Sequence, residues 1–321
     1  MAVGALLAGC GGDDGGPEPP PGQSRSDFER TLDSAAQAKR SDFPPVEGRT
    51  LQEVANTIDA GPTVGLATAD FVPGENRLAF GVIGRDNRFV YGKSAVYVAP
   101  TPQDRATGPF PAPARSLLVE PPFRSRGSAS EANGLAAVYS TGIPTPRPGG
   151  YAVLVITKTP EGFVGAPTTI QVPTRSEVVA VGDPAPRVAT ETVESANGDI
   201  ASIDTRVPPS DMHEVSLDDV LGKRPVALLF ATPQLCQSRV CGPVTDVALQ
   251  LKKKYGDQVE FIHQEVYTDN DPNKPLREPL RRFGLTTEPW LFTIDAQGQV
   301  AARLEGSFGI DEFEQAIKAA Q

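Results

Sequence analysis

The sequence predicts a multidomain protein in which an N-terminal all-β domain precedes a C-terminal α/β domain. Seven short apolar or alternating runs, separated by turn-forming residues, fill residues 62–174, as in a β-sandwich. From residue 187 onward, strand-like runs instead alternate with helical periodicity, which favours an α/β sheet. A chain of 321 residues is long enough for two cores, and its 32 prolines and 31 glycines suit short strands joined by turns.

The charge of the chain limits its partners. Its formal net charge is -10 and its pI is about 4.9, so its field repels phosphate backbones. We therefore expect no nucleic-acid partner. No apolar run reaches the length that a transmembrane helix needs.

Residues 1–26 indicate the remnant of a lipoprotein signal followed by a flexible tether. The first nine residues are almost wholly apolar or small, and the run Leu-Ala-Gly-Cys that ends at Cys10 resembles the bacterial lipobox. The resemblance implies that Cys10 is lipidated and anchors an extracytoplasmic protein to the cell membrane. Since this signal is short and has no basic region, we expect the true start codon further upstream. The alternative is an unmodified cysteine in a disordered tail.

Residues 27–61 are expected to form a helical arm, whose second helix begins at Thr50 with Glu53 placed to complete a reciprocal cap. The strands expected over residues 62–174 fit an immunoglobulin-like (Ig-like) sandwich. This part has no cysteine and no histidine, so we expect neither catalysis nor a thiolate or imidazole metal site in it. We interpret it as a spacer or docking module. The expected strands are residues 63–70, 77–83, 89–99, 117–121, 135–141, 151–157 and 163–172.

After a linker at residues 175–186, the domain at residues 187–321 holds the chemistry. Residues 226–231 have the length and continuous apolarity of a strand that is buried on both faces. Cys236 and Cys241 follow, and a helical pattern comes next. Thiols at the start of a helix face its positive dipole end, which favours the nucleophilic thiolate. The apolar positions of the helix are Val244, Val247, Ala248 and Leu251.

The order of strand, cysteine pair and helix, together with the later run Thr-Glu-Pro-Trp around Pro289, resembles the thioredoxin superfamily. In that family a cis-proline faces the cysteines, so the resemblance implies this role for Pro289, with Glu288 beside it. A final strand, turn, strand and helix from Asp311 match the closing order of the family. Thioredoxins place two residues between their cysteines. The spacing found here, with four residues between the cysteines, resembles that of peroxiredoxins whose attacking and resolving cysteines share one helix.

The spacing of the two cysteines argues against an ordinary structural disulfide. Residues five apart in a continuous helix have Cα atoms about 8–9 Å apart, beyond the reach of a disulfide. The turn must therefore be unwound, and Pro243 allows this because proline is favoured at the start of a helix. Closing so short a loop contributes only about 2 kcal/mol. A redox pair is therefore preferred over a structural staple.

Other polar residues near the motif have two interpretations each. Arg239 either assists the thiolate or is a solvated charge, and Glu288 either relays protons to a buried thiol or is an exposed loop acid. His263 is expected to be a hydrogen-bonded strand histidine rather than a ligand, and a ligand role for His213 has even less support. We predict no metal site and no cofactor.

The leading hypothesis is a membrane-anchored thiol-disulfide oxidoreductase acting on protein disulfides or thiols. In it, Cys236 attacks, Cys241 resolves the mixed disulfide, and Pro289 shapes the substrate groove. The first alternative is a thiol peroxidase, in which a sulfenic acid on Cys236 condenses with Cys241. Non-enzymatic alternatives are copper delivery of the Sco type, with His263 as the third ligand, and a binding module stabilised by a structural disulfide. A further assignment reverses the two cysteines, because Cys241 precedes Gly-Pro at the helix start.

Overall fold

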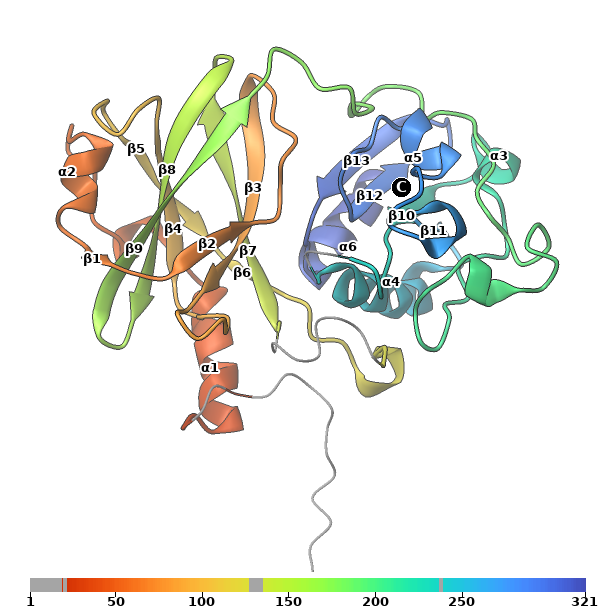
Figure 1. Ribbon diagram of the computed structural model, residues 1–321, viewed down its shortest axis with the longest axis horizontal. Coiled ribbons are helices and arrows are strands. Elements are labelled where there is room, and N and C mark those ends of the chain that lie inside the picture. The colour runs from red at the N-terminus through yellow and green to blue at the C-terminus, as the bar shows by residue number, and fades with distance from the viewer. Residues whose placement is uncertain (1–18, 20–21, 127–134, 237–238) are drawn as a thin grey trace, which may run out of the picture.

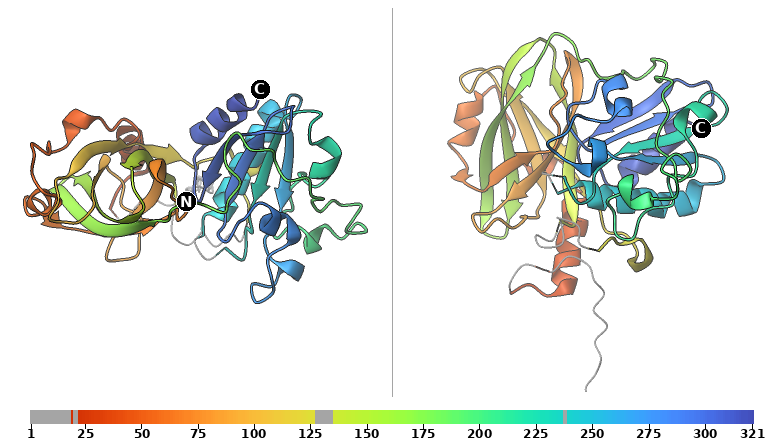
Figure 2. Two further views of the ribbon diagram at one scale, coloured as in Figure 1. Left: turned by 90° about the horizontal axis from the view of Figure 1, so that it is seen from above. Right: turned by 45° about the vertical axis from the view of Figure 1, so that its right-hand side comes forward.

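The computed structural model describes residue 19 and residues 22–126, 135–236 and 239–321. Two parts follow one another along the chain, a β-sandwich and an α/β part (Figure 1). They lie side by side, as the two further views in Figure 2 show. Cys10 and its apolar run lie outside the described residues, as do the two positions just after Cys236.

The N-terminal part consists of two facing sheets with strand orders β1-β9-β8-β4-β5 and β2-β3-β7-β6. All the ladders are antiparallel except the short β1–β9 pair, which is parallel. The strands are β1 (Asp59–Ala60), β2 (Thr63–Leu66), β3 (Gly74–Ile83), β4 (Ser94–Ala99), β5 (Thr107–Ala112), β6 (Ala114–Ser116), β7 (Ala137–Thr145), β8 (Gly149–Thr159) and β9 (Gly162–Val172).

Alternating side chains from the two sheets meet in one apolar core. Leu78 and Phe80 from β3 pack in the same cluster as Val153 and Val155 from β8, because successive strand residues point to opposite faces. Helix α1 (Arg25–Ala35) contributes Ala35 to this core. The helices α2 (Leu51–Ala55) and η1 (Arg40–Asp42) precede the sheets.

The cap predicted for the second helix is confirmed. The Glu53 backbone N–H donates to Thr50 Oγ1 at 3.1 Å, and the Thr50 N–H donates to Glu53 Oε2 at 2.7 Å. This reciprocal pair satisfies two backbone donors that the first turn of a helix leaves open.

The strand expected at residues 117–121 is wrong. Residues 117–120 have no regular structure and lead into the short helix η2 (Pro121–Phe123), while β5 and β6 lie just before them. Prolines obscure β5 in the sequence, but proline is tolerated there because β5 is an edge strand. The apolar side chains of Leu117 and Val119 are buried against the α/β part instead.

The C-terminal part is built on a four-stranded sheet of order β11-β10-β12-β13. Strands β10 and β11 are parallel, whereas β12 is antiparallel to both β10 and β13. The elements are η4 (Ile200–Ser202), α3 (Leu217–Val220), β10 (Val226–Phe230), α4 (Cys241–Tyr255), β11 (Glu260–Gln264), η5 (Thr268–Asn270), α5 (Glu278–Arg282), β12 (Trp290–Ile294), β13 (Val300–Glu305) and α6 (Ile310–Ala319).

Strand β10 is buried on both faces, as its continuous apolarity predicts. Ala227 and Leu229 pack in the cluster that holds α4 and α6. Leu228 and Phe230 pack in the cluster that includes Leu217, the first residue of α3. The central strand is thereby fixed, and the loop that leaves its end carries the cysteines.

The segment expected as a linker is held by backbone hydrogen bonds to the end of the α/β sheet. The Gly182 N–H donates to the Val300 carbonyl at 2.8 Å, and the Val300 N–H donates to the Asp183 carbonyl at 2.9 Å. This part of residues 175–186 therefore lies along β13.

Charged side chains join the two parts. The Arg77 guanidinium in β3 pairs with Glu312 in α6 at 2.9 Å and also donates to the carbonyls of Glu305 and Ser307. The Glu305 carboxylate accepts the backbone N–H groups of Ala69 and Asp70. These hydrogen bonds and the ion pair link the sandwich to the α/β part.

Candidate active site

Cys236 and Cys241 lie between the end of β10 and the start of α4. Cys241 is the first residue of α4, while Cys236 lies five residues earlier in an irregular turn. The Cys236 N–H donates to the Thr232 carbonyl at 3.1 Å. The predicted unwinding before the helix is confirmed, and it brings the two thiols into hydrogen-bonding contact.

Burial raises the pKa of the Cys241 thiol. Cys241 is fully buried, with an exposed fraction of 0%, compared with 4% for Cys236. Burial raises the pKa of Cys241 well above its usual range, and the hydrogen bond and charge of Cys236 raise it further. Cys241 is therefore held as a neutral thiol beside Cys236 when Cys236 carries charge.

The pKa of the Glu288 carboxyl group also depends on the charge of Cys236. The peptide bond between Glu288 and Pro289 is cis, as the resemblance implies for Pro289. Glu288 is half-buried rather than fully exposed, and burial together with the charge of Cys236 raises its pKa to about 7. A carboxyl with this pKa can both give and accept a proton near neutral pH.

Tyr267 is a site residue that sequence reasoning missed. Its hydroxyl donates to Glu288 Oε1 at 3.4 Å. Burial raises the pKa of Tyr267 to about 12, and the charges of Glu288, Cys241 and Cys236 contribute to the shift. Tyr267 follows β11 closely, so only the pairing of β11 with β10 brings it near the cysteines.

Arg239 belongs to the cysteine turn. Its backbone N–H donates to the Cys236 carbonyl at 3.2 Å, and its φ of 62° lies in the left-handed region. Its side chain is exposed. The backbone of Arg239 thus shapes the turn.

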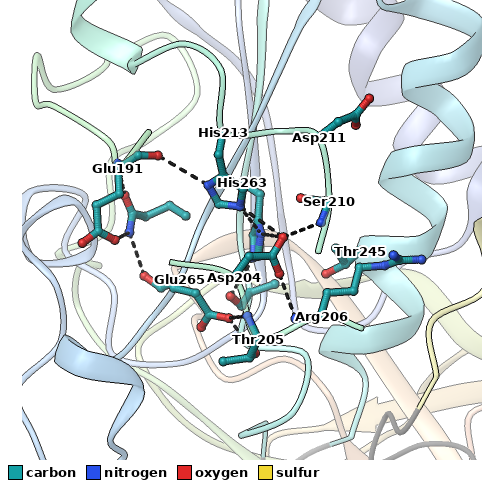
Figure 3. A network of polar contacts seen from close by, with 12 residues as sticks. Glu191, Asp204, Thr205, Arg206, Ser210, Asp211, His213, Thr245, His263 and Glu265 are labelled. Carbon is teal, nitrogen blue, oxygen red and sulfur yellow. Dashed lines mark hydrogen bonds and ion pairs between the residues drawn. The ribbon is translucent and has the colours of Figure 1, made fainter. Parts of the chain in front are cut away.

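A second polar cluster consists of Asp204, His213 and His263 (Figure 3). His213 Nε2 lies 3.1 Å from His263 Nδ1, and Asp204 Oδ2 lies 3.2 Å from His213 Nε2 and 3.6 Å from His263 Nδ1. All three residues are buried. Burial opposes ionisation of Asp204, but the charges and hydrogen bonds of His263 and His213 outweigh it and hold its pKa below the usual range.

The hydrogen bond expected for His263 is confirmed, since its Nε2 lies 3.0 Å from the Ala231 carbonyl. Its other ring nitrogen faces His213 and Asp204. These contacts do not assemble the two thiols and one imidazole that Sco-type copper delivery requires. Sequence reasoning gave His213 little weight and missed Asp204, because no local spacing connects them with His263.

No protein family description and no curated protein matches this chain. Among solved structures, it is similar to a protein described as a thiol:disulfide interchange protein DsbE from Chlorobium tepidum. That match has 21% identity and a TM-score of 0.31, and it covers 44% of this chain and 98% of the other.

Two further solved structures are similar at the same low level. A thiol:disulfide interchange protein of the thioredoxin family from Chlorobium tepidum TLS has 22% identity and a TM-score of 0.31, over 44% of this chain and 97% of the other. The PKD domain of the human receptor SorCS2 has 16% identity and a TM-score of 0.20, over 37% of this chain and 78% of the other. At these TM-scores the matches assign neither a family nor a function to this chain.

Proposed function

We propose that this protein is a thiol-disulfide oxidoreductase with a thioredoxin-like C-terminal domain behind an Ig-like sandwich. The observation that carries the proposal is the contact between the thiols of Cys236 and Cys241, beside a carboxyl, Glu288, that responds to the charge of Cys236. A purely structural disulfide needs no such proton-exchanging group. The cis-proline at position 289 and the sheet order support the same proposal.

The chemistry follows from the raised pKa of the Cys241 thiol and the Glu288 carboxyl beside the pair. The Cys236 thiolate attacks one sulfur of a substrate disulfide, which forms a mixed disulfide and releases the other substrate sulfur as a thiolate. Cys241 then loses its proton, for which the Glu288 carboxylate is the acceptor, and its thiolate attacks the Cys236 sulfur. The second substrate thiolate leaves. One substrate disulfide is reduced to two thiols, and the Cys236–Cys241 pair is oxidised to a disulfide.

The reduction potential of the cysteine pair tests this proposal. We expect a value between about -270 mV, as for thioredoxin, and about -180 mV, as for protein disulfide isomerase. The same preparation should reduce insulin disulfides faster than it reduces hydrogen peroxide. A potential far below about -300 mV would show a structural bridge. Rapid oxidation of Cys236 by micromolar peroxide, with insulin untouched, would support the thiol peroxidase instead.

We also propose that the protein is extracytoplasmic and anchored to the membrane through lipidated Cys10. The support is the lipobox-like run and the tether behind it. In the described part of the chain, no helix has both the length and the apolarity to cross a bilayer. Mass spectrometry of membrane fractions should find a diacylglyceryl group on Cys10. An unmodified Cys10, in a host that processes lipoproteins, would contradict the anchor.

A further inference from the structure

We propose that Asp204, His213 and His263 form a binding site for a divalent transition-metal ion of the zinc type. The three residues come from two segments, Asp204 and His213 from the loop between η4 and α3 and His263 from β11, and their donor atoms converge (Figure 3). The distances among these atoms, the direction of each imidazole and the local charge all support the site.

The spacing of the donor atoms fits a tetrahedral ion. Zinc binds histidine nitrogens and carboxylate oxygens at about 2.0–2.1 Å, which places the ligands of a tetrahedral ion about 3.3–3.4 Å from one another. The three separations here are 3.1 Å, 3.2 Å and 3.6 Å. One ion placed among the three atoms therefore reaches all of them at ordinary bond lengths.

The outward-facing nitrogens of both rings are held by backbone carbonyls. His263 Nε2 lies 3.0 Å from the Ala231 carbonyl, and His213 Nδ1 lies 3.4 Å from the Glu191 carbonyl. A carbonyl oxygen only accepts hydrogen bonds, so the proton of each neutral ring is on its outer nitrogen. The inner nitrogens then present lone pairs. Such carbonyl contacts are how proteins orient histidine ligands of metals.

Three lone-pair donors that face one another require a positive charge between them. His213 Nε2, His263 Nδ1 and the ionised Asp204 oxygen repel each other unless a metal ion or a shared proton lies there. The neighbouring Arg206 pairs instead with Asp246 at 2.9 Å. A divalent cation placed among the three donor atoms supplies the positive charge.

The donor set selects the class of metal. Two imidazoles and one carboxylate suit zinc and its neighbours, whereas calcium and magnesium take oxygen ligands. The Asp204 carboxylate is itself fixed by backbone donors, with the Ser210 N–H on Oδ2 and the Arg206 N–H on Oδ1. The Ser210 hydroxyl in the same loop is buried and has no hydrogen-bond partner among the described residues.

The site would brace the cysteine loop. The Ala231 carbonyl that holds His263 comes just before Thr232, whose own carbonyl accepts the Cys236 N–H. The Gln234 N–H, within the cysteine turn, donates to the Thr205 hydroxyl, next to Asp204 in the chain. A metal at this site therefore ties the loop that carries Asp204 to the base of the turn.

The test uses the full chain with Cys236→Ser and Cys241→Ser, because the thiol pair is itself a potential zinc ligand. After growth in zinc-supplemented medium, elemental analysis should find about one zinc per chain. In this background, Asp204→Asn and His213→Gln should each reduce the bound zinc at least tenfold. The matched control is Asp211→Asn. Asp211 lies in the same loop, is exposed and is not one of the three donor residues, so this variant should keep its zinc.

Zinc retained by both ligand variants, or none in the parent, would overturn the site and leave a shared proton as its occupant. A readout that needs no ligand variant is the spectrum of the cobalt form of the Cys236→Ser and Cys241→Ser protein. Intense visible bands of four-coordinate cobalt, without thiolate charge-transfer bands, are expected. A pale six-coordinate spectrum or no bound cobalt would contradict the proposal.

Discussion

At the scale of single residues, the raised pKa of Cys241 bears on which of the two sulfurs attacks the substrate. Cys241 is fully buried at the start of α4, and its raised pKa outweighs the benefit of the helix dipole at that position. This favours Cys236 as the attacking sulfur. It argues against the reversed assignment, in which Cys241, before Gly-Pro at the helix start, is the attacking sulfur.

We predict that Cys241→Ser accumulates a mixed disulfide between Cys236 and a substrate, because the resolving thiol is missing. Cys236→Ser should form no adduct. Mass spectrometry after incubation with an insulin-type disulfide measures both variants. An adduct only in Cys236→Ser would reverse the roles. If neither variant traps substrate and both lose about 2 kcal/mol of stability, the pair is structural.

We predict that the rate of disulfide reduction rises with pH through about 7, where Glu288 loses its proton and becomes able to accept one from Cys241. Glu288→Gln should lose this inflection and slow the reaction about tenfold or more at pH 8. The measurement is the pH profile of kcat/KM with an insulin-type disulfide. Glu278→Gln, at an exposed position in α5, is the matched control and should keep the wild-type profile. An unchanged inflection in Glu288→Gln would remove Glu288 from the mechanism.

The raised pKa of Glu288 also makes the stability of the folded state depend on pH. Because burial and Cys236 raise the pKa of Glu288 above its unfolded value, the folded state binds the proton more tightly. This stabilisation is present at low pH and is lost as the pH rises through about 7.

At the scale of elements, the start of α4 decides whether the cysteines can meet. A helix that began at Cys236 would hold the two Cα atoms about 8–9 Å apart. Pro243 lies in the first turn of α4, where a missing N–H costs nothing, and the turn before it stays irregular. Strand β10 fixes where this turn begins, since both of its faces are packed.

At the scale of the whole molecule, the sandwich and the α/β part meet at closely packed backbone. Gly306 has a φ of 70°, and a Cβ at this position would lie 1.6 Å from the Ala67 carbonyl oxygen. The Gly306 N–H also donates to the Pro289 carbonyl at 2.8 Å. The interface between the two parts therefore lies close to the proposed substrate groove.

We predict that Gly306→Ala lowers the free energy of unfolding by more than about 2 kcal/mol, because the methyl group collides with the Ala67 carbonyl. Gly222→Ala is the matched control. Its φ of 78° imposes the same backbone strain, but no atom lies within 4 Å of the added Cβ. Thermal denaturation of both variants gives the comparison. Equal losses of stability would show that the two parts do not pack in this way.

The sequence by itself determined the elements whose signals are local. The apolar run before Cys236, the helix from Cys241, the Thr50 cap and most of the sandwich strands are readable because side-chain periodicity and capping act over a few residues. The sequence does not predict the edge strand β5, because its prolines conceal it. It predicts a strand at residues 117–121 because the side chains of Leu117 and Val119, which are buried against the α/β part, leave the same apolar signal as a strand.

Only the tertiary structure decided which polar groups meet. Tyr267 and Glu288 lie 21 positions apart, and His213 and His263 lie 50 apart. Tyr267 and Glu288 meet because β10 pairs with β11 on one side and with β12 on the other. His213 meets His263 because the His263 N–H donates to the Met212 carbonyl at 3.0 Å. The physical reason is that hydrogen bonding and ionisation depend on distance in space and on burial, and neither is set by spacing along a chain.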